Sequence, residues 1–136
     1  MDNAQTLTNR GKLKMNVAII YILVAVVTSA VGQILLKKGM TGMGPLTLSP
    51  NQVVSIIMRI ATNPYVVIGL LIYVCGTLFW LVALSRVELS FAYPFASLSY
   101  IVMLVASWQL FKEDISLIRV IGTVVVGIGV LIISRS

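Results

Sequence analysis

Histidine is absent from this 136-residue chain, and only one cysteine, Cys75, is present. Without histidine the chain lacks the commonest metal ligand and proton shuttle. One thiol excludes an internal disulfide framework and a site built from several thiolates. Carboxylates are also scarce, since Asp and Glu together number four. We therefore expect no metal, no cofactor and no enzyme activity.

Charge is sparse as well, at 10% of residues against 59% hydrophobic, and the mean hydropathy is +1.04. The apolar residues gather in four runs of about the 20 residues that a helix needs to cross a bilayer. This pattern predicts an all-α membrane protein. We expect a polar, unordered tail at 1–14, then one transmembrane domain at 15–136 with helices at about 16–36, 65–85, 89–111 and 115–134.

The net charge of +6 is distributed between the apolar runs and forms no stripe or patch. Such a distribution is typical of basic residues that meet anionic lipid headgroups, and it argues against a nucleic-acid partner. If each run spans once, the two sides carry five basic residues each, which gives no orientation by the positive-inside rule. Two topologies stay open: insertion both ways, with an antiparallel homodimer, or a single orientation set by the basic residues before the first helix.

The first loop contains its own pattern. Gly39 to Pro45 is typical of a flexible turn region. Ser49 is a candidate N-cap, with Pro50 at the first helical position, and apolar residues follow on one helical face. We predict a short amphipathic helix at about 50–62, which lies in the membrane interface or acts only as a structural strap.

Polar residues inside the apolar runs are the best pointers to function, because lipid offers them no hydrogen bonds. Ser29, Gln33 and Lys37 recur every four residues and share one helical face. The second run carries Tyr73 and Trp80, which alternate with glycines. The third carries Tyr93 and Ser97, with Pro94 predicting a kink near the membrane surface. Each has a plain packing or interface explanation, but together they predict an amphipathic cavity.

Gly122 and Gly129 lie seven residues apart on the fourth, mostly aliphatic run. Such spacing allows close helix contact, so these glycines are candidates for a dimer interface or for packing within one subunit. Among the carboxylates, Glu88 lies beside Arg86, and Glu113 with Asp114 follows Lys112. Local ion pairs explain all of them. Because only Glu88 is placed for burial, we do not expect proton coupling.

Three segments resemble the drug/metabolite transporter superfamily in its four-helix form. They are Gly32 to Lys38, Ala83 to Pro94 with its Ala-Tyr-Pro ending, and Phe111-Lys112-Glu113 followed by the two glycines. The chain is similar to the EamA-like aminoarabinose-lipid flippase subunits, and the resemblance covers nearly everything from Asn16 onward. It implies movement of polyprenyl-phosphate-linked sugars across the bacterial inner membrane.

The related small multidrug resistance family has four helices and an antiparallel homodimer. It carries an essential glutamate in helix one, where this chain has Ser29. Its first loop is also much shorter than 37–64. This departure argues against proton/drug antiport.

The leading hypothesis is a transporter subunit that flips a lipid-linked sugar as a homodimer or with a similar four-helix partner. In this hypothesis Ser29 and Gln33 contact sugar hydroxyls, aromatic residues stack on the sugar, and basic residues bind its phosphate or only anchor the helix ends. The alternatives are an exporter of small amphipathic or cationic metabolites or drugs that uses Glu88, and a non-transporting subunit that partners a glycosyltransferase. The predicted substrate-binding residues are Ser29, Gln33, Lys37, Tyr73, Trp80, Arg86, Glu88, Tyr93 and Ser97.

Overall fold

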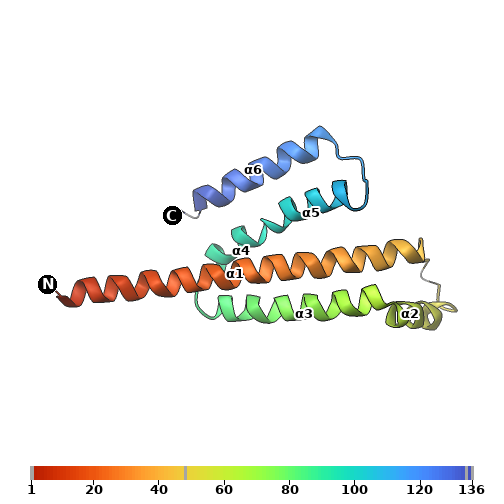
Figure 1. The fold of residues 1–136 in the computed structure, drawn as a ribbon, viewed down its shortest axis with the longest axis horizontal. Coiled ribbons are helices and arrows are strands. Elements are labelled where there is room, and N and C mark those ends of the chain that lie inside the picture. Colours follow the sequence, from red (N-terminus) through yellow and green to blue (C-terminus); the bar gives the residue numbers. More distant parts are fainter. Residues whose placement is uncertain (1, 48, 134, 136) are drawn as a thin grey trace.

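The computed structural model describes residues 2–47, 49–133 and 135, with side chains from Asn9 onward. All regular structure in these residues is helical. Figure 1 shows α1 and α3 side by side, with α4, α5 and α6 on the other side of α1. The helices are α1 (Asp2–Met43), α2 (Val53–Thr62), α3 (Pro64–Leu84), α4 (Leu89–Ala96), α5 (Ser99–Gln109) and α6 (Leu117–Ile133).

Helix α1 is longer than the sequence predicts at both ends. It has 42 residues, about 63 Å, or twice the hydrocarbon thickness. The predicted unordered tail is helical from Asp2, because residues 2–14 contain no proline and extend a helix that the apolar run already stabilises. At the other end, Gly39 belongs to the helix and not to a flexible turn. The turn comes later, where Gly44 has a φ of +71°.

Helices α1 and α3 contact each other backbone to backbone. A Cβ atom added at Gly32 would lie 2.8 Å from both the Gly69 oxygen and the Tyr73 nitrogen, and one added at Gly76 would lie 2.9 Å from the Ser29 nitrogen. At Gly39 the neighbour is a side chain, since an added Cβ would lie 2.7 Å from Val66 Cγ2. These glycines belong to a buried seam that repeats every seven residues: Ala18, Ala25, Gly32 and Gly39 on α1, and Gly69, Gly76 and Ala83 on α3.

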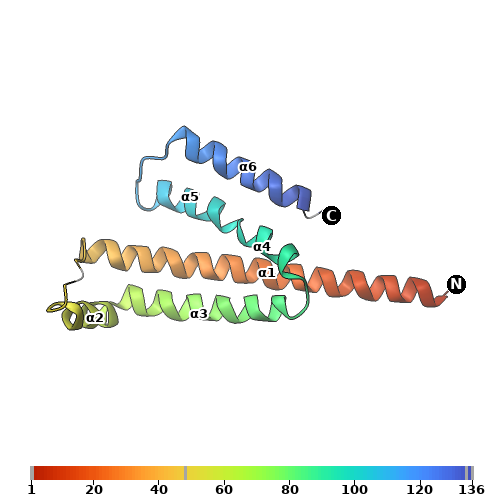
Figure 2. The ribbon, with the colours of Figure 1, turned by 180° about the vertical axis from the view of Figure 1, so that it is seen from behind.

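The third apolar run is two helices instead of one. After α4 the chain makes a turn at Ser97 and Leu98, where the Ser97 and Leu98 amides donate to carbonyls only three residues back. Pro94 lies one turn before this break, and it has no N–H to donate to Ser90. The predicted kink is therefore present, and it redirects α5. In both ribbon views the α5–α6 hairpin slopes away from α1 (Figures 1 and 2).

Helix α2 begins at Val53. The predicted N-cap at Ser49 would instead start the helix three residues earlier, at Pro50. The Ser49 carbonyl instead accepts from the Gln52 amide at 2.8 Å and closes a turn. The helix is amphipathic and buries Ile56, while Arg59 donates to the Met43 carbonyl at 3.3 Å. The Asn63 side chain then caps α3, accepting from the Tyr65 amide at 3.0 Å. Helix α2 thus joins the ends of α1 and α3.

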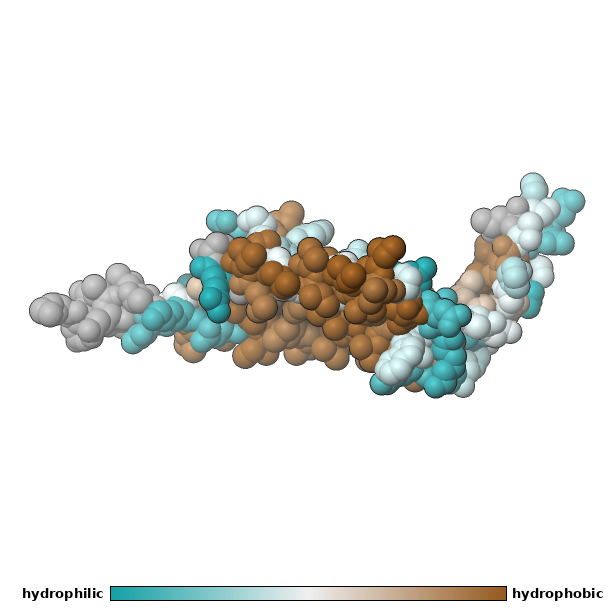
Figure 3. Space-filling view, turned by 90° about the horizontal axis from the view of Figure 1, so that it is seen from above, coloured by the Kyte–Doolittle hydropathy of each residue, from teal (hydrophilic) through white to brown (hydrophobic). Residues whose placement is uncertain are grey.

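The remaining helix faces are apolar and exposed. Figure 3 shows a continuous hydrophobic belt bounded by hydrophilic residues at both ends. By length and composition, three stretches of the described residues suit a membrane crossing: Asn9–Met43, Pro64–Leu84 and Leu89–Gln109, the last of which includes the break. Helix α6 is apolar but has 17 residues. An exposed belt of this kind is what lipid solvates.

A small core closes the end of the bundle near the α3–α4 link. It contains Ile22 and Val26 of α1, Ala83 of α3, Ala92 and Phe95 of α4, and Val130 of α6. Because α4 is held here while α5 slopes away from α1, the helices enclose a space beside the seam.

The seam predicts a position-specific effect of adding one methyl group. Gly32→Ala should lower the free energy of unfolding by about 1–3 kcal/mol, because its Cβ meets backbone atoms that cannot move aside. Gly42→Ala, on the same helix with nothing within 4 Å of its Cβ, should be neutral or stabilising by up to about 1 kcal/mol. Denaturant titration in detergent, followed by circular dichroism, measures both. Equal stability of the two variants would rule out the seam.

Candidate functional site

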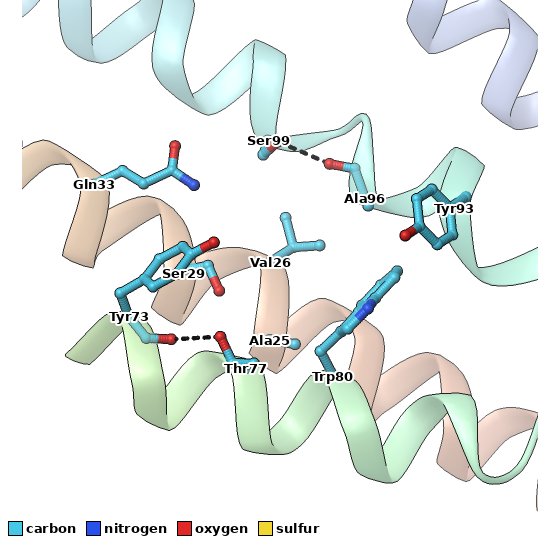
Figure 4. A pocket seen from close by; sticks show the side chains of 10 residues that line it. All are labelled: Ala25, Val26, Ser29, Gln33, Tyr73, Thr77, Trp80, Tyr93, Ala96 and Ser99. Atoms are coloured by element: carbon cyan, nitrogen blue, oxygen red, sulfur yellow. Dashed lines mark hydrogen bonds between the residues drawn. The ribbon is translucent and has the colours of Figure 1, made fainter. Parts of the chain in front are cut away.

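The space beside the seam is a cavity of about 290 Å³ between α1, α3 and the α4–α5 segment (Figure 4). Ten residues line it: Ala25, Val26, Ser29 and Gln33 from α1, Tyr73, Thr77 and Trp80 from α3, and Tyr93, Ala96 and Ser99 from α4 and α5. Tyr73 and Tyr93 are 38% and 57% exposed, so the cavity is open on its outer side. Three separate apolar runs therefore build one site.

The polar groups come from the predicted stripe. Ser29 and Gln33 are one helical turn apart on α1, and the Gln33 amide points toward the cavity in Figure 4. The hydroxyl of Tyr73 points into the same space from α3. None of the residues that line the cavity is charged. The site therefore offers neutral hydrogen-bond donors and acceptors in an apolar frame.

Two further hydroxyls are already bonded to the backbone. Thr77 Oγ1 donates to the Tyr73 carbonyl at 3.0 Å, and Ser99 Oγ donates to the Ala96 carbonyl at 2.8 Å (Figure 4). Each hydroxyl uses its hydrogen in this bond and keeps lone pairs as acceptors. Ser99 also satisfies a carbonyl at the break between α4 and α5, where the helical ladder is interrupted.

Aromatic rings form the end of the cavity near the α3–α4 link. Trp80 and Tyr93 meet edge to face, with ring centroids 5.6 Å apart and an interplanar angle of 73°. This is a favoured geometry for aromatic pairs. The Tyr93 hydroxyl points back toward the middle of the cavity in Figure 4. Polar and aromatic groups thus face the same space.

Lys37 completes the α1 stripe but lies outside the cavity lining. Its ammonium nitrogen is 2.9 Å from Glu113 Oε1 and 5.7 Å from the centre of the Phe111 ring. The predicted local pairing of Glu113 with Lys112 is therefore wrong, because the carboxylate crosses to α1 instead. A hydrogen bond from Lys37 lowers the pKa of Glu113, helped by that lysine's charge, a hydrogen bond from Ser107 and the charge of Arg119, while desolvation opposes them.

Three other predicted site residues also lie outside the cavity lining. The Arg86 guanidinium stacks over the Tyr21 ring at 5.1 Å, and no ion pair joins it to Glu88 in the described part of the chain. Glu88 is exposed at the N-terminus of α4, where its carbonyl accepts from the Phe91 amide. The Ser97 hydroxyl donates to the Pro94 carbonyl and so serves the break.

Sequence reasoning missed five lining residues: Ala25, Val26, Thr77, Ala96 and Ser99. Thr77 follows Tyr73 by one helical turn, so the same periodicity identifies it. Ala25 precedes Ser29 by one turn in the same way, whereas Ala96 and Ser99 depend on where the α4–α5 break lies. Gly122 and Gly129 have no atom of the described residues within 4 Å of an added Cβ, and Gly122 lines a hollow between α5 and α6. No cluster of three or more metal-binding side chains occurs among the described residues.

Comparison with known proteins gives relatives along most of the chain. The EamA-like transporter family matches residues 57–135. The chain is 30% identical over 125 residues to the probable 4-amino-4-deoxy-L-arabinose-phosphoundecaprenol flippase subunit ArnF of Proteus mirabilis, which covers 89% of this chain and 94% of the relative. It is 32% identical over 120 residues to the corresponding ArnF of Photorhabdus laumondii, with 85% and 95% covered.

A shorter match joins the chain to the second kind of subunit. The probable flippase subunit ArnE of Aeromonas hydrophila is 32% identical over 71 residues, covering 52% of this chain and 62% of that protein. No solved structure matches the chain significantly. Since the family match covers more than half of the residues and the ArnF relatives align along most of them, this multi-pass membrane protein belongs to the EamA-like transporter family.

Proposed function

We propose that this protein is a subunit of a bacterial inner-membrane flippase that moves a polyprenyl-phosphate-linked sugar from one leaflet to the other. The relatives named as probable subunits for an aminoarabinose-phosphoundecaprenol flippase support the substrate class. The observation that carries the proposal is the convergence of Ser29, Gln33, Tyr73, Trp80 and Tyr93 on one uncharged cavity.

The cavity suits a sugar in chemistry and in size. Sugar hydroxyls donate and accept hydrogen bonds, as do the Gln33 amide and the Tyr73 hydroxyl, and the Trp80 ring offers an apolar face. A volume of about 290 Å³ lies at the small end of ligand pockets, which span about 300–1,000 Å³. It has room for a sugar headgroup and not for a polyprenyl chain. The polyprenyl chain therefore stays in the lipid, which the exposed side of the cavity faces.

The uncharged lining favours a sugar over a cationic metabolite. An exporter of cations needs a carboxylate beside its substrate, and Glu88 lies outside the cavity on the α3–α4 link. Phe91 and Ala92 donate to its backbone carbonyl at 3.1 Å each, in the first turn of α4. A non-transporting role is tested separately, because flipping by the purified protein excludes it.

Basic residues flank the cavity at opposite ends. Lys37 lies 16 positions after Tyr21, the residue that contacts Arg86. The helical rise puts about 24 Å between these two levels of α1, close to the thickness of the hydrocarbon. In this proposal Lys37 binds the phosphate in one leaflet and Arg86 binds it in the opposite leaflet. One bound phosphate does not contact both cations.

In this proposal α6 is the fourth span and the contact to a second subunit, either a copy of this chain or a similar partner. Its 17 residues reach the lower limit for crossing a bilayer. Gly122 and Gly129 are open to contact, whereas glycines with the same spacing on α3 meet the α1 backbone. A second helix at this face would gain the same close approach.

Removing either of two cavity side chains should reduce flipping. Gln33→Ala and Tyr93→Ala should each slow the flipping of a polyprenyl-phosphate sugar in reconstituted liposomes at least tenfold, which corresponds to about 1.4 kcal/mol of lost interaction. Tyr65→Ala is the matched control, because Tyr65 is also an exposed tyrosine, at 44%, but does not line this cavity. Wild-type rates in both cavity variants would refute the assignment.

The dimer face should respond to bulk on one side of α6 only. Gly122→Leu and Gly129→Leu should weaken self-association or partner binding at least tenfold while leaving the subunit folded, because an added Cβ at either position has no atom of the described residues within 4 Å. Val124→Leu, on the opposite face and 57% exposed, should have little effect. Chemical cross-linking in native membranes measures association. Unchanged cross-linking in both glycine variants would exclude α6 as the interface.

A further inference from the structure

The end of the cavity stripe contains an ion pair between distant parts of the chain. Lys37 follows Ser29 and Gln33 at four-residue intervals, so it lies one turn beyond the cavity on the same face of α1. Its ammonium group contacts Glu113 Oε1 at 2.9 Å and lies over the Phe111 ring. The cation one helical turn beyond Gln33 is therefore paired with an internal carboxylate.

The backbone of the α5–α6 loop places the Glu113 carboxylate beside Lys37. Lys112 has a φ of +53°, in the left-handed region that residues other than glycine rarely adopt. The next residue, Glu113, then donates its backbone N–H to the Ser107 carbonyl at 3.0 Å. This contact turns the loop back over α5. The carboxylate thereby reaches α1, although 76 positions separate Glu113 from Lys37.

Groups from three helices act on this carboxylate, and one of them, the Lys37 ammonium, contacts it directly. Lys37 comes from α1, the Ser107 hydroxyl from α5, and Arg119 from the first turn of α6, and all three favour its charged form. The pKa of Glu113 is therefore below its ordinary value, so the pair is intact at neutral pH. Cations and hydroxyls are also the groups that bind a phosphate, and Ser107 and Arg119 line one hollow between α5 and α6.

The internal pair is accessible and exchangeable. The side chains of Lys37 and Glu113 are 50% and 37% exposed. Ion pairs this open to solvent contribute little to stability, because water competes with them. The phosphodiester of a polyprenyl-phosphate sugar carries the same single negative charge as a carboxylate and also presents two unesterified oxygens, so it is a competitive replacement for Glu113.

We propose that Lys37, Ser107 and Arg119 form the binding site for the phosphate of the lipid-linked substrate, and that Glu113 occupies this site when substrate is absent. The proposal rests on the proposed flippase function and adds the phosphate site to the sugar cavity. Phosphate binding displaces Glu113 and so removes the ion pair between α1 and the α5–α6 loop.

Binding of radiolabelled undecaprenyl phosphate to the purified full-length protein in detergent tests the site. Glu113→Gln should bind about two- to fivefold more tightly than wild type, because it removes a weak internal competitor. Lys37→Gln should bind roughly tenfold more weakly or worse, because it removes a charge-assisted contact. The affinity of Arg119→Gln for undecaprenyl phosphate should lie between those of wild type and Lys37→Gln. Circular dichroism checks that each variant is folded.

Two neighbouring residues provide matched controls. Asp114→Asn removes the adjacent carboxylate, and Lys38→Gln removes the adjacent ammonium, which lies 4.9 Å from the centre of the Tyr65 ring. Both should bind like wild type. Undecaprenol, which lacks the phosphate, should show no difference among the variants. Inorganic phosphate should compete only weakly, whereas competition as strong as that of the lipid would make free phosphate the ligand and overturn a lipid site.

The sign of the Glu113→Gln effect separates the two roles of the ion pair. If Glu113→Gln and Lys37→Gln both bind undecaprenyl phosphate more weakly than wild type, the ion pair has a structural role. This result would overturn the phosphate site but not the flippase proposal. The flippase proposal would then still stand on binding by wild type and on the cavity variants. No binding by wild type or by Glu113→Gln would count against both.

Discussion

The close approach of α1 and α3 determines where every functional side chain lies. In lipid, apolar side chains gain nothing by leaving hydrocarbon for one another, so helices associate through packing and hydrogen bonds. The seam provides this packing, because Gly32, Gly69 and Gly76 let the two backbones contact directly. Tyr73 and Trp80 lie at the edge of the seam. They therefore face the same space as the α1 stripe.

The bent α4–α5 segment completes the cavity that begins beside the α1–α3 seam. Pro94 and the turn after it divide the third apolar run, so α4 packs into the small core while α5 slopes away from α1 (Figure 2). Without the break, a straight helix would continue along its original direction and would not bring Ser99 to the cavity. The hydroxyls of Ser97 and Ser99 compensate the interrupted ladder by donating to carbonyls of the same segment. The cavity thus depends on a rigid pair of helices and a bent third element.

Sequence patterns named five of the ten residues that line the cavity, but they did not give the partner of the charged residue at its end. A four-residue repeat puts Ser29 and Gln33 on one face of α1 whatever that helix packs against. The partner of Lys37 could not be predicted in this way, because it depends on a loop 76 positions away and on the backbone of Lys112. Glycine was ambiguous for another reason. In sequence Gly39 is typical of a turn, but in the structure it lies in α1, where its lack of a side chain allows close packing against Val66 of α3.

The distribution of charge is consistent with transport between leaflets. A cation in the middle of the cavity would hold a phosphate there and slow its release, since a conducting site must bind well enough to admit a ligand and weakly enough to let it leave. The cavity lining is neutral. Lys37 belongs to α1 and Arg86 contacts Tyr21 of the same helix, at levels about 24 Å apart along the helix axis. Each is partnered within the chain, by Glu113 and by the Tyr21 ring. On the proposed function, neutral contacts in the middle carry the sugar, while exchangeable partners at the ends keep either cation from trapping the phosphate.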